Sequence, residues 1–459
     1  MSRTVYEFTV QSPPGDPITY DIERLADAMR IDDISRLSVE SRGSQAIVTV
    51  YPDDPLADVH LPDPDLLAMD ERGRVWAGLY HNGRRVWVRL YDPVSGSAQR
   101  LLLFGTTGAG KSTAGQILLA AMKRSGIAVW YADLKGGQSA PEARGNVDWP
   151  VFTQEGAIAQ LRTYWDVMKD REERYARLGR SKFLKDRPDP LMYEVIDEAN
   201  RLLEKGAPYR DEATYYIKDI GRTGRSLGMG IALFAQAGHL EELGGSDTLR
   251  SMLKEGEVLL LRWTSNLMRQ LVADGLLPPG QKLAPIPKYA GATRLISQFE
   301  AEEDENRPGT QGSGYLLSGP YPGARMRFFR VGSALPTEGL DPEMLALYGD
   351  GPHAALEKSA WPVAGDAYTQ RLDGDAAYTA AFARNVTVGP GTNPPPPPPA
   401  PGASQASDRL TITDRVQAAL ENNGGADMDA HALLTAVNAD GGRTVALGSI
   451  RNALSRLRT

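Results

Sequence analysis

The sequence contains no cysteine, and this absence excludes two kinds of structure. None of the 459 residues is Cys, so neither a disulfide nor a thiolate metal site can form. A chain without thiols fits the reducing cytoplasm, which is where we expect the protein to act.

Long hydrophobic runs are also missing. No apolar stretch approaches the roughly 18 residues that a membrane-spanning helix requires, and the N-terminus lacks the apolar core of a signal peptide. We therefore expect a soluble protein that is peripheral at a membrane only if membrane-associated or septum-associated partner proteins hold it there.

The chain has no excess of positive charge. It carries 51 Lys and Arg against 58 Asp and Glu, for a net charge of −7. This balance argues against a protein coated in nucleic acid, but not against a local basic surface, since DNA contacts depend on where Lys and Arg lie. The length predicts two to four domains.

What the sequence does contain is a complete phosphate-binding motif. Residues 105–112 read Gly-Thr-Thr-Gly-Ala-Gly-Lys-Ser and match G-x-x-x-x-G-K-[ST]. An apolar strand pattern precedes them and a helical pattern follows, which is the context that the motif requires. Backbone N–H groups of the loop and the helix N-terminus would bind phosphate. The predicted ATP-binding residues are Gly105, Thr106, Thr107, Gly108, Ala109, Gly110, Lys111, Ser112 and Thr113.

A second group of polar residues follows apolar strands further along the chain. Asp197 and Glu198 end the predicted strand 191–196, and Gln236 ends the predicted strand 230–235. Lys111 would reach the β- and γ-phosphates, while Ser112 and Asp197 would hold Mg²⁺. Glu198 would polarise the attacking water. Gln236 either senses the γ-phosphate or is an ordinary polar strand end.

The strand pattern predicts an α/β fold. Apolar strands at 101–104, 128–133, 191–196, 230–235 and 257–261 alternate with helical stretches, which indicates a doubly wound, mostly parallel sheet. A closing antiparallel hairpin is expected at 314–318 and 325–331. These elements place a P-loop ATPase domain at residues 96–335.

Residues 1–95 predict a small α/β module followed by a β-hairpin. The hairpin turns at Asn82-Gly83, a pair that suits tight reversal. Its aromatic residues form either a stacking surface for bases or ordinary packing, and packing is favoured. They are Trp76, Tyr80, Trp87 and Tyr91.

The C-terminal part is expected to contain a linker and a third module. Residues 336–407 predict weak structure and a proline-rich linker whose six consecutive prolines, 394–399, suit a stiff spacer better than an SH3-type ligand. Residues 408–459 predict three short helices, either a winged-helix-like helix-turn-helix that reads DNA or a small bundle for subunit contacts. The candidate DNA-binding residues are Arg443, Arg451, Asn452, Ser455 and Arg456.

Taken together, the motifs resemble a known family. The P-loop, Asp133-Leu134-Lys135, the segment Glu172–Tyr175, Asp197-Glu198 and the segment Arg225–Gln236 follow the order of FtsK/SpoIIIE-type DNA translocases, over roughly residues 20–335. The chain is most similar to the TraB-like conjugative plasmid transfer proteins of actinobacteria. The resemblance implies a RecA-like fold, ATP and Mg²⁺ as cofactors, and a ring, expected to be a hexamer, that pumps double-stranded DNA.

The resemblance has two departures and one added expectation. Leu134 stands where the family has proline, and the strand before Gln236 reads Phe-Ala-Gln in place of Ala-Thr-Gln. In such rings an arginine from the neighbouring subunit completes each site, and Arg225 is the candidate, with Arg222 one turn earlier. Arg225 could instead bind a DNA phosphate or a local carboxylate.

Two other functions compete with a DNA motor. One is an ATPase of the same superfamily that drives protein secretion, and the other is a nucleotide-sensing DNA-binding regulator that does not cycle. Glu198 argues against the regulator, because a sensor need not hydrolyse.

Overall fold

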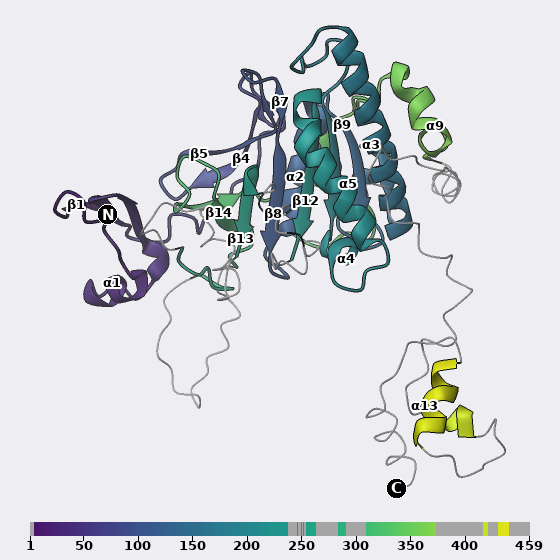
Figure 1. Cartoon of the computed structure of the whole chain (residues 1–459). Helices are drawn as coiled ribbons and strands as arrows, with labels where there is room; N and C mark the ends of the chain where they lie inside the picture. Colours follow the sequence, from purple (N-terminus) through teal and green to yellow (C-terminus); the bar gives the residue numbers. More distant parts are fainter. Residues whose placement is uncertain are drawn as a thin grey trace. The chain divides into compact units, whose positions relative to one another are not determined.

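The structure is a computed structural model, shown in Figure 1. It describes residues 4–236, 246, 249, 251, 254–262, 283–290, 309–372, 416–420 and 430–439. The chain divides into two compact units, Met1–Pro395 and Pro396–Thr459. Among the described residues, no helix is both long enough and apolar enough to cross a membrane.

The large unit is built on a ten-stranded sheet. In spatial order its strands are β10 (Trp149–Val151), β9 (Ala128–Asp133), β11 (Met192–Asp197), β12 (Met229–Ala235), β8 (Arg100–Gly105), β13 (Glu257–Leu261), β14 (Ser313–Leu316), β15 (Arg325–Phe328), β4 (Arg74–Tyr80) and β5 (Arg85–Arg89). The first six are parallel to one another, and each of the last four is antiparallel to the strand before it in this order. The predicted mostly parallel α/β sheet is therefore confirmed, with its five core strands within one residue of their expected bounds.

The connections between the parallel strands reverse direction beside β8. The chain first crosses from β8 past β12 and β11 to β9 and continues to the edge strand β10. It then returns to β11 and β12, and β13 follows on the other side of β8. Since such crossovers are right-handed, α2 (Lys111–Arg124) covers one face, while α3 (Gln154–Arg177) and α5 (Arg210–Thr223) cover the other (Figure 1). Short helices η3 (Pro141–Gly145), α4 (Asn200–Leu203) and η4 (Gly224–Leu227) complete these connections. A ligand site is expected where the strand order reverses, at the carboxyl ends of the strands.

The core of this unit lies between the sheet and these helices. Strands β8, β9, β11 and β12 are buried at every position, as expected for strands with both faces covered. Fully buried aromatic rings, among them Trp130, Trp149 and Tyr164, pack edge to face within it.

The hairpin β4–β5 belongs to this sheet and not to a separate N-terminal module, which corrects the boundary expected near residue 95. Strand β15 pairs with β4, and this pairing joins segments about 250 residues apart that sequence patterns cannot link.

The aromatic residues of the hairpin serve packing. Tyr80 and Tyr91 are buried. Trp76 packs edge-on against Phe329 with ring centroids 4.9 Å apart, so it contributes to packing, as the sequence favoured. Arginine side chains cover both indole rings, Arg85 over Trp76 at 4.0 Å and Arg74 over Trp87 at 4.7 Å. The small strands β6 (Tyr91–Asp92) and β7 (Ser97–Ala98) lead from the hairpin to β8.

The true N-terminal module is a three-stranded antiparallel sheet and one helix. Its strands are β1 (Tyr6–Gln11), β2 (Leu37–Arg42) and β3 (Gln45–Val50), in the order β1-β3-β2, and its helix is α1 (Ile22–Ala28). Asp21 caps α1 by accepting backbone N–H groups from Glu23 and Arg24. The short helices η1 (Ile34–Arg36) and η2 (Pro64–Leu66) follow α1 and β3.

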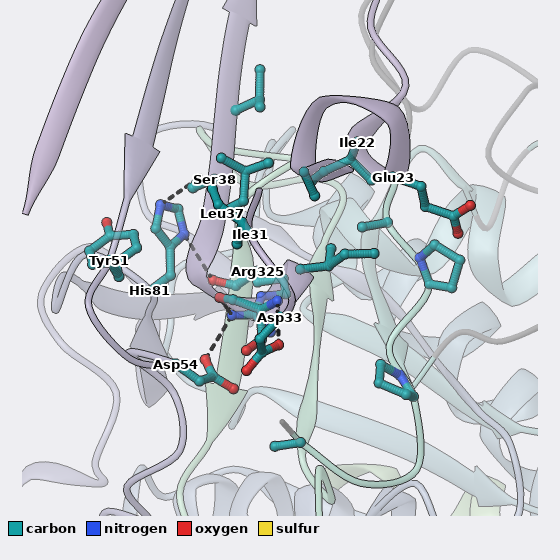
Figure 2. Close-up of a pocket in the computed structure, with 18 of the residues that line it drawn as sticks. Ile22, Glu23, Ile31, Asp33, Leu37, Ser38, Tyr51, Asp54, His81 and Arg325 are labelled. Atoms are coloured by element: carbon teal, nitrogen blue, oxygen red, sulfur yellow. Dashed lines mark hydrogen bonds and ion pairs between the residues drawn. The ribbon is translucent and has the colours of Figure 1, made fainter. Parts of the chain in front are cut away.

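His81, in the β4–β5 turn, connects the N-terminal module to the large sheet (Figure 2). Its Nε2 lies 2.9 Å from Ser38 Oγ and 3.5 Å from Glu40 Oε1. Arg325, from β15, donates to Asp54 Oδ1 at 2.8 Å. A cavity of about 340 Å³ lies at this junction. The polar contacts show that the module is held to the sheet by specific side chains.

The segment after residue 335, expected to be weakly structured, contains two packed helices up to Thr369. Helix α8 (Pro342–Tyr348) lies against α2, and α9 (Trp361–Thr369), preceded by η6 (Lys358–Ala360), lies against α3. Leu347, Tyr348, Ala364 and Tyr368 join the main core. These helices are short and weakly periodic, and tertiary contacts stabilise them more than local propensity does. The proline run lies outside the described residues.

In the C-terminal unit, the structure describes residues 416–420, which are helical, and α13 (Ala430–Ala439). These match the first two helices expected from the sequence. Val416, Leu433 and Val437 are buried. The third expected helix, with Arg443, Arg451, Asn452, Ser455 and Arg456, lies outside the described residues.

Candidate functional site: the carboxyl edge of the parallel strands

The parallel register brings the sequence-predicted residues to one edge of the sheet. Phe104 pairs with Ala235, and Asp197 pairs with Phe234. The P-loop, Glu198 and Gln236 each follow directly after one of these strands. Since parallel strands end at the same edge, their side chains meet there.

The P-loop turns on residues that only glycine suits. Gly108 and Gly110 have φ angles of 73° and 93°, a region that other residues rarely adopt. A Cβ on Gly110 would also lie 2.7 Å from the backbone nitrogen of Gly312. The Gly312 N–H in turn donates to Ala109 O at 2.8 Å. The turn before β14 therefore fixes the shape of the loop.

Helix α2 begins at Lys111 without a side-chain cap. Its first N–H groups therefore remain available, and together with the positive end of the helix they suit a bound anion. Thr107, Gly108 and Ser112 are exposed. The phosphate-binding surface is thus open to a ligand.

A chain of three side chains crosses the site. Lys111 Nζ donates to Glu198 Oε1 at 2.8 Å, and Gln236 Nε2 donates to Glu198 Oε2 at 2.9 Å. Lys111 and Glu198 are both almost fully buried. The two carboxylate oxygens of Glu198 are therefore held from opposite sides, by a cation and by an amide.

The backbone at Glu198 is in an unusual conformation. Its φ angle is 55°, in the left-handed region that is unfavourable for residues with a side chain. Two hydrogen bonds hold it there: Asp197 Oδ1 accepts the Glu198 N–H at 2.8 Å, and Phe234 O accepts the Ala199 N–H at 2.9 Å. Strain maintained by neighbouring contacts is typical of functional positions, and here it directs the carboxylate toward Lys111.

Asp197 lies deeper than Glu198. Its burial raises the pKa of its carboxyl, and Lys111, 3.6 Å away, opposes that rise. Asp133, at the end of neighbouring β9, is fully buried and raises the pKa of Asp197 further by like-charge repulsion. A cation placed beside Asp197 would relieve both effects.

These residues fit a magnesium ion only in combination with a nucleotide. Among the described residues, no cluster of three or more His, Asp or Glu side chains could hold a metal ion by itself. Mg²⁺ commonly binds through one or two carboxylates together with substrate phosphates. Asp197 and the Ser112 hydroxyl are the side chains that would hold it.

Asp133, which the sequence marked only through the family resemblance, organises a loop. Its carboxylate accepts the backbone N–H groups of Lys135 and Ser139 at 2.9 and 2.7 Å, and the Ser139 hydroxyl at 3.1 Å. Arg201 donates to Leu134 O at 3.2 Å. The position where the family has proline is therefore held by hydrogen bonds.

Arg225 is not part of the site in its own chain. It lies in η4 at the amino end of β12, where Nε donates to Ala98 O at 3.4 Å. The seven residues of β12 separate it from Gln236, a distance of about 23 Å at 3.3 Å per residue. Arg222 is exposed on α5.

One residue near the P-loop was not singled out from the sequence. Arg262 follows β13, the neighbour of β8 on the side away from β12, and its backbone oxygen accepts the Thr106 hydroxyl at 3.2 Å. A basic residue directly after an apolar strand is the sequence signal that marks it, by the same reasoning that found Glu198 and Gln236.

The site has the parts of a P-loop ATPase. It combines a phosphate-binding loop and helix N-terminus with a lysine, a carboxylate that suits a metal ion and a second carboxylate beside the lysine.

Comparison with known proteins gives distant structural likenesses. The sequence matches no protein-family model and no curated protein. Among solved structures it is similar to the cytoplasmic domain of the Thermomonospora curvata type VII secretion ATPase EccC, with 22% identity and a TM-score of 0.45 over 67% of this chain and 34% of that one.

Two further structures show the same level of likeness. The pCW3 conjugation coupling protein TcpA, solved as a monomer with ATPγS, has 16% identity and a TM-score of 0.43 over 59% of this chain and 77% of that one. EssC (ATPases 2 and 3) from Geobacillus thermodenitrificans has 15% identity and a TM-score of 0.45, covering 65% and 53%. The chain thus spans about a third of the EccC structure and about half of the EssC structure. Likenesses of this size do not transfer an activity to this chain.

Proposed function

We propose that this chain is an ATP-driven motor that moves double-stranded DNA, works as a ring of identical subunits, and carries a C-terminal module that reads DNA sequence. The observation that supports ATP hydrolysis is the Glu198 carboxylate, held between Lys111 and Gln236 at the end of the P-loop. The DNA substrate rests on the order of motifs shared with FtsK/SpoIIIE-type translocases.

The charges at the site suggest the order of events in one cycle. Lys111 pairs with Glu198 in the structure. An arriving triphosphate offers Lys111 a stronger partner, because phosphate oxygens carry more charge than one carboxylate. Lys111 then turns to the phosphates, and Glu198 is released to accept a proton from the attacking water. Gln236 keeps the other oxygen of Glu198 in place.

Magnesium supplies charge neutralisation at the phosphates when it is bound. Asp197 supports this proposal, because a buried carboxyl with a raised pKa gains most from a nearby cation. The Ser112 hydroxyl begins the same helix as Lys111 and is exposed to the site.

The position of Arg225 supports a ring. An arginine about 23 Å from Gln236 cannot complete the site of its own subunit, but it lies at the opposite edge of the sheet, where it can face a neighbour. We therefore propose Arg225 as the residue that completes the adjacent site, and a hexamer as the assembly. In this proposal Arg222 contributes to the same surface.

We also propose that the C-terminal helices read DNA. The buried positions of Val416, Leu433 and Val437 support a small helical module. Its candidate contacts to base edges and phosphates remain those proposed from the sequence, namely Arg443, Arg451, Asn452, Ser455 and Arg456.

The deciding experiment measures the ATPase rate per subunit with and without long duplex DNA. A DNA motor is expected to hydrolyse faster on DNA, and its rate should rise with protein concentration as subunits assemble. Adding Arg225→Ala subunits to wild-type protein should lower the rate more than in proportion to their share. A rate that DNA leaves unchanged would contradict the DNA motor and favour another ATPase function, such as protein secretion.

A further inference from the structure

Arg262 is connected to the P-loop through its backbone. It directly follows β13, whose last residue, Leu261, pairs with Gly105. Its own N–H donates to Ser313 O at 2.8 Å, and its carbonyl accepts the Thr106 hydroxyl at 3.2 Å. Its φ angle is 36°, a strained value for a residue with a side chain. The surrounding hydrogen bonds therefore hold Arg262 in a conformation that it would not adopt by itself.

Among the described residues, the buried guanidinium of Arg262 has no counter-charge. Arg262 is 4% exposed, and its Nε donates to Thr310 Oγ1 at 3.3 Å. Within the described part of the chain, Nη2 has no hydrogen-bond partner. Burial lowers the pKa of Arg262, Tyr289 opposes this shift, and no carboxylate of the described residues acts on the guanidinium. An arginine nevertheless stays charged in proteins, so this cation lacks an anion among the residues that the structure describes.

The free end of this side chain faces the phosphate-binding loop. Nη1 lies 3.5 Å from the position that a Cβ on Gly108 would occupy. Because residue 108 is glycine, the space between the guanidinium and the loop stays open. The other buried cation at the loop, Lys111, already has Glu198 and Asp197 as partners. Arg262 is therefore a cation at the loop for which the described residues supply no anion.

The strand order indicates which phosphates of a bound nucleotide would lie near Arg262. Glu198 and Gln236 follow strands on one side of β8, while Arg262 follows β13 on the other side. The terminal phosphate of a bound triphosphate must face Glu198, where water attacks. A group on the opposite side of the loop then meets the phosphates nearer the nucleoside, which ATP and ADP share.

We propose that Arg262 binds the diphosphate part of a nucleoside di- or triphosphate in its own subunit, from the side of the P-loop opposite Glu198. This inference rests on the proposed nucleotide site and adds to it a second cation that holds the nucleotide before and after hydrolysis. The guanidinium suits the task, since its planar donors match phosphate oxygens in pairs.

The test is equilibrium binding of fluorescent ATP and ADP analogues to the full chain, in wild type, Arg262→Gln and Arg262→Lys. Arg262→Gln should raise the dissociation constants for both nucleotides by about 10–100-fold, as expected for the loss of a charge-assisted pair. Arg262→Lys should recover part of the affinity. Arg84→Gln, which removes an exposed charge from the β4–β5 turn, should bind as wild type does.

A melting curve without nucleotide separates binding from a structural role. Because Arg262 has no anionic partner in the described chain, Arg262→Gln should melt at the wild-type temperature or above it, and nucleotide should stabilise it less than wild type. If wild type binds no nucleotide, the proposed function itself fails. If wild type binds and Arg262→Gln binds ADP equally well, or loses affinity for ATP alone, the assignment of Arg262 is overturned.

Discussion

Two groups of buried charges in the large unit are built in different ways. Around α3, Arg171 donates to Glu357 at 2.8 and 2.7 Å and to the carbonyls of Leu227 and Pro190. Arg174 contacts Asp170, Asp189 and Glu357. Every charge in this α3 network has a permanent partner. At the P-loop, by contrast, Lys111 holds the Glu198 carboxylate, which the proposed cycle requires it to release. Arg262 holds no carboxylate among the described residues.

The difference separates structural charges from functional ones. Burying an ion costs several kcal/mol unless partners compensate it, so a network with all its partners present serves the fold. The α3 network binds Glu357, the residue that precedes η6, to α3, and η6 and α9 lie against the same helix. A buried cation without an anion costs stability in the free protein, and a charged ligand is the partner that recovers it.

The largest expected effect is on catalysis. Glu198→Gln should lower the hydrolysis rate by about 10²–10⁴-fold, since a general base contributes about that much. Nucleotide affinity should stay the same or increase, because Lys111 no longer has to leave a carboxylate. Single-turnover kinetics and equilibrium binding measure the two quantities, and wild-type turnover in this variant would show that another group is the base.

The matching change in the α3 network should affect stability instead. Arg171→Ala leaves Glu357 partly uncompensated and should lower the free energy of unfolding by about 3–5 kcal/mol, measured by denaturant titration. The double variant Arg171→Met, Glu357→Leu serves as the control and should recover much of this loss. Hydrolysis per folded molecule at low temperature should stay close to wild type. A loss of hydrolysis in the folded variant would contradict the distinction between the α3 network and the charges at the P-loop.

Glu194 sharpens the comparison, because it is a buried acid that does not belong to the P-loop site. It lies in β11, and among the described residues neither of its carboxyl oxygens has a hydrogen-bond partner. Its burial raises its pKa well above the ordinary value. Unlike an arginine, an acid escapes the cost of a buried charge by keeping a proton.

Glu194→Met should therefore stabilise the protein by about 1–3 kcal/mol at neutral pH. The folded state holds a proton that the unfolded chain releases above about pH 4.3, so wild-type stability falls as pH rises beyond that value. The advantage of the Met variant should be larger at pH 8 than at pH 5, as measured by thermal unfolding. An equal or smaller advantage at pH 8 would mean that Glu194 is ionised in the fold.

The smallest expected effect concerns Glu257, in β13. Burial raises its pKa to about 7, while the Ser318 hydroxyl, 2.9 Å away, lowers it. The raised pKa means that folded-state stability falls between about pH 4.5 and pH 7. Glu257→Gln should remove this fall, with a gain of about 1–2 kcal/mol at pH 8, after allowing for solvent screening at a half-buried side chain, and little change at pH 4. Parallel stability curves for the two proteins would contradict the assignment.

Much of the parallel sheet and its P-loop was predictable because their signals are local. An apolar run, a glycine-rich loop and a helical pattern adjoin one another at residues 101–122, so the P-loop needed no tertiary information. The strands ending at Asp133, Asp197 and Ala235 were also predicted within one residue of their observed bounds. Because they are parallel, their polar end residues had to share one edge of the sheet.

Other features depend on residues far apart in the chain. The hairpin β4–β5 enters the sheet through β15, about 250 residues later, and α9 is held by the pairing of Glu357 with Arg171, 186 residues away. Local patterns contain no information on such pairings. For the same reason the sequence suggested a domain boundary near residue 95 and weak structure after residue 335.

The sequence by itself determined the nucleotide-binding loop, the alternation of strands and helices, and the identity of the side chains at the strand ends, because each depends on neighbours within a few residues. Only the tertiary structure decided how those side chains are paired. It placed Glu198 between Lys111 and Gln236, put Arg225 at the far edge of the sheet, and left Arg262 buried beside Gly108 without an anion in the described chain. The physical reason is that the charge state and partners of a buried group depend on what surrounds it in space, and the chain fold fixes those surroundings.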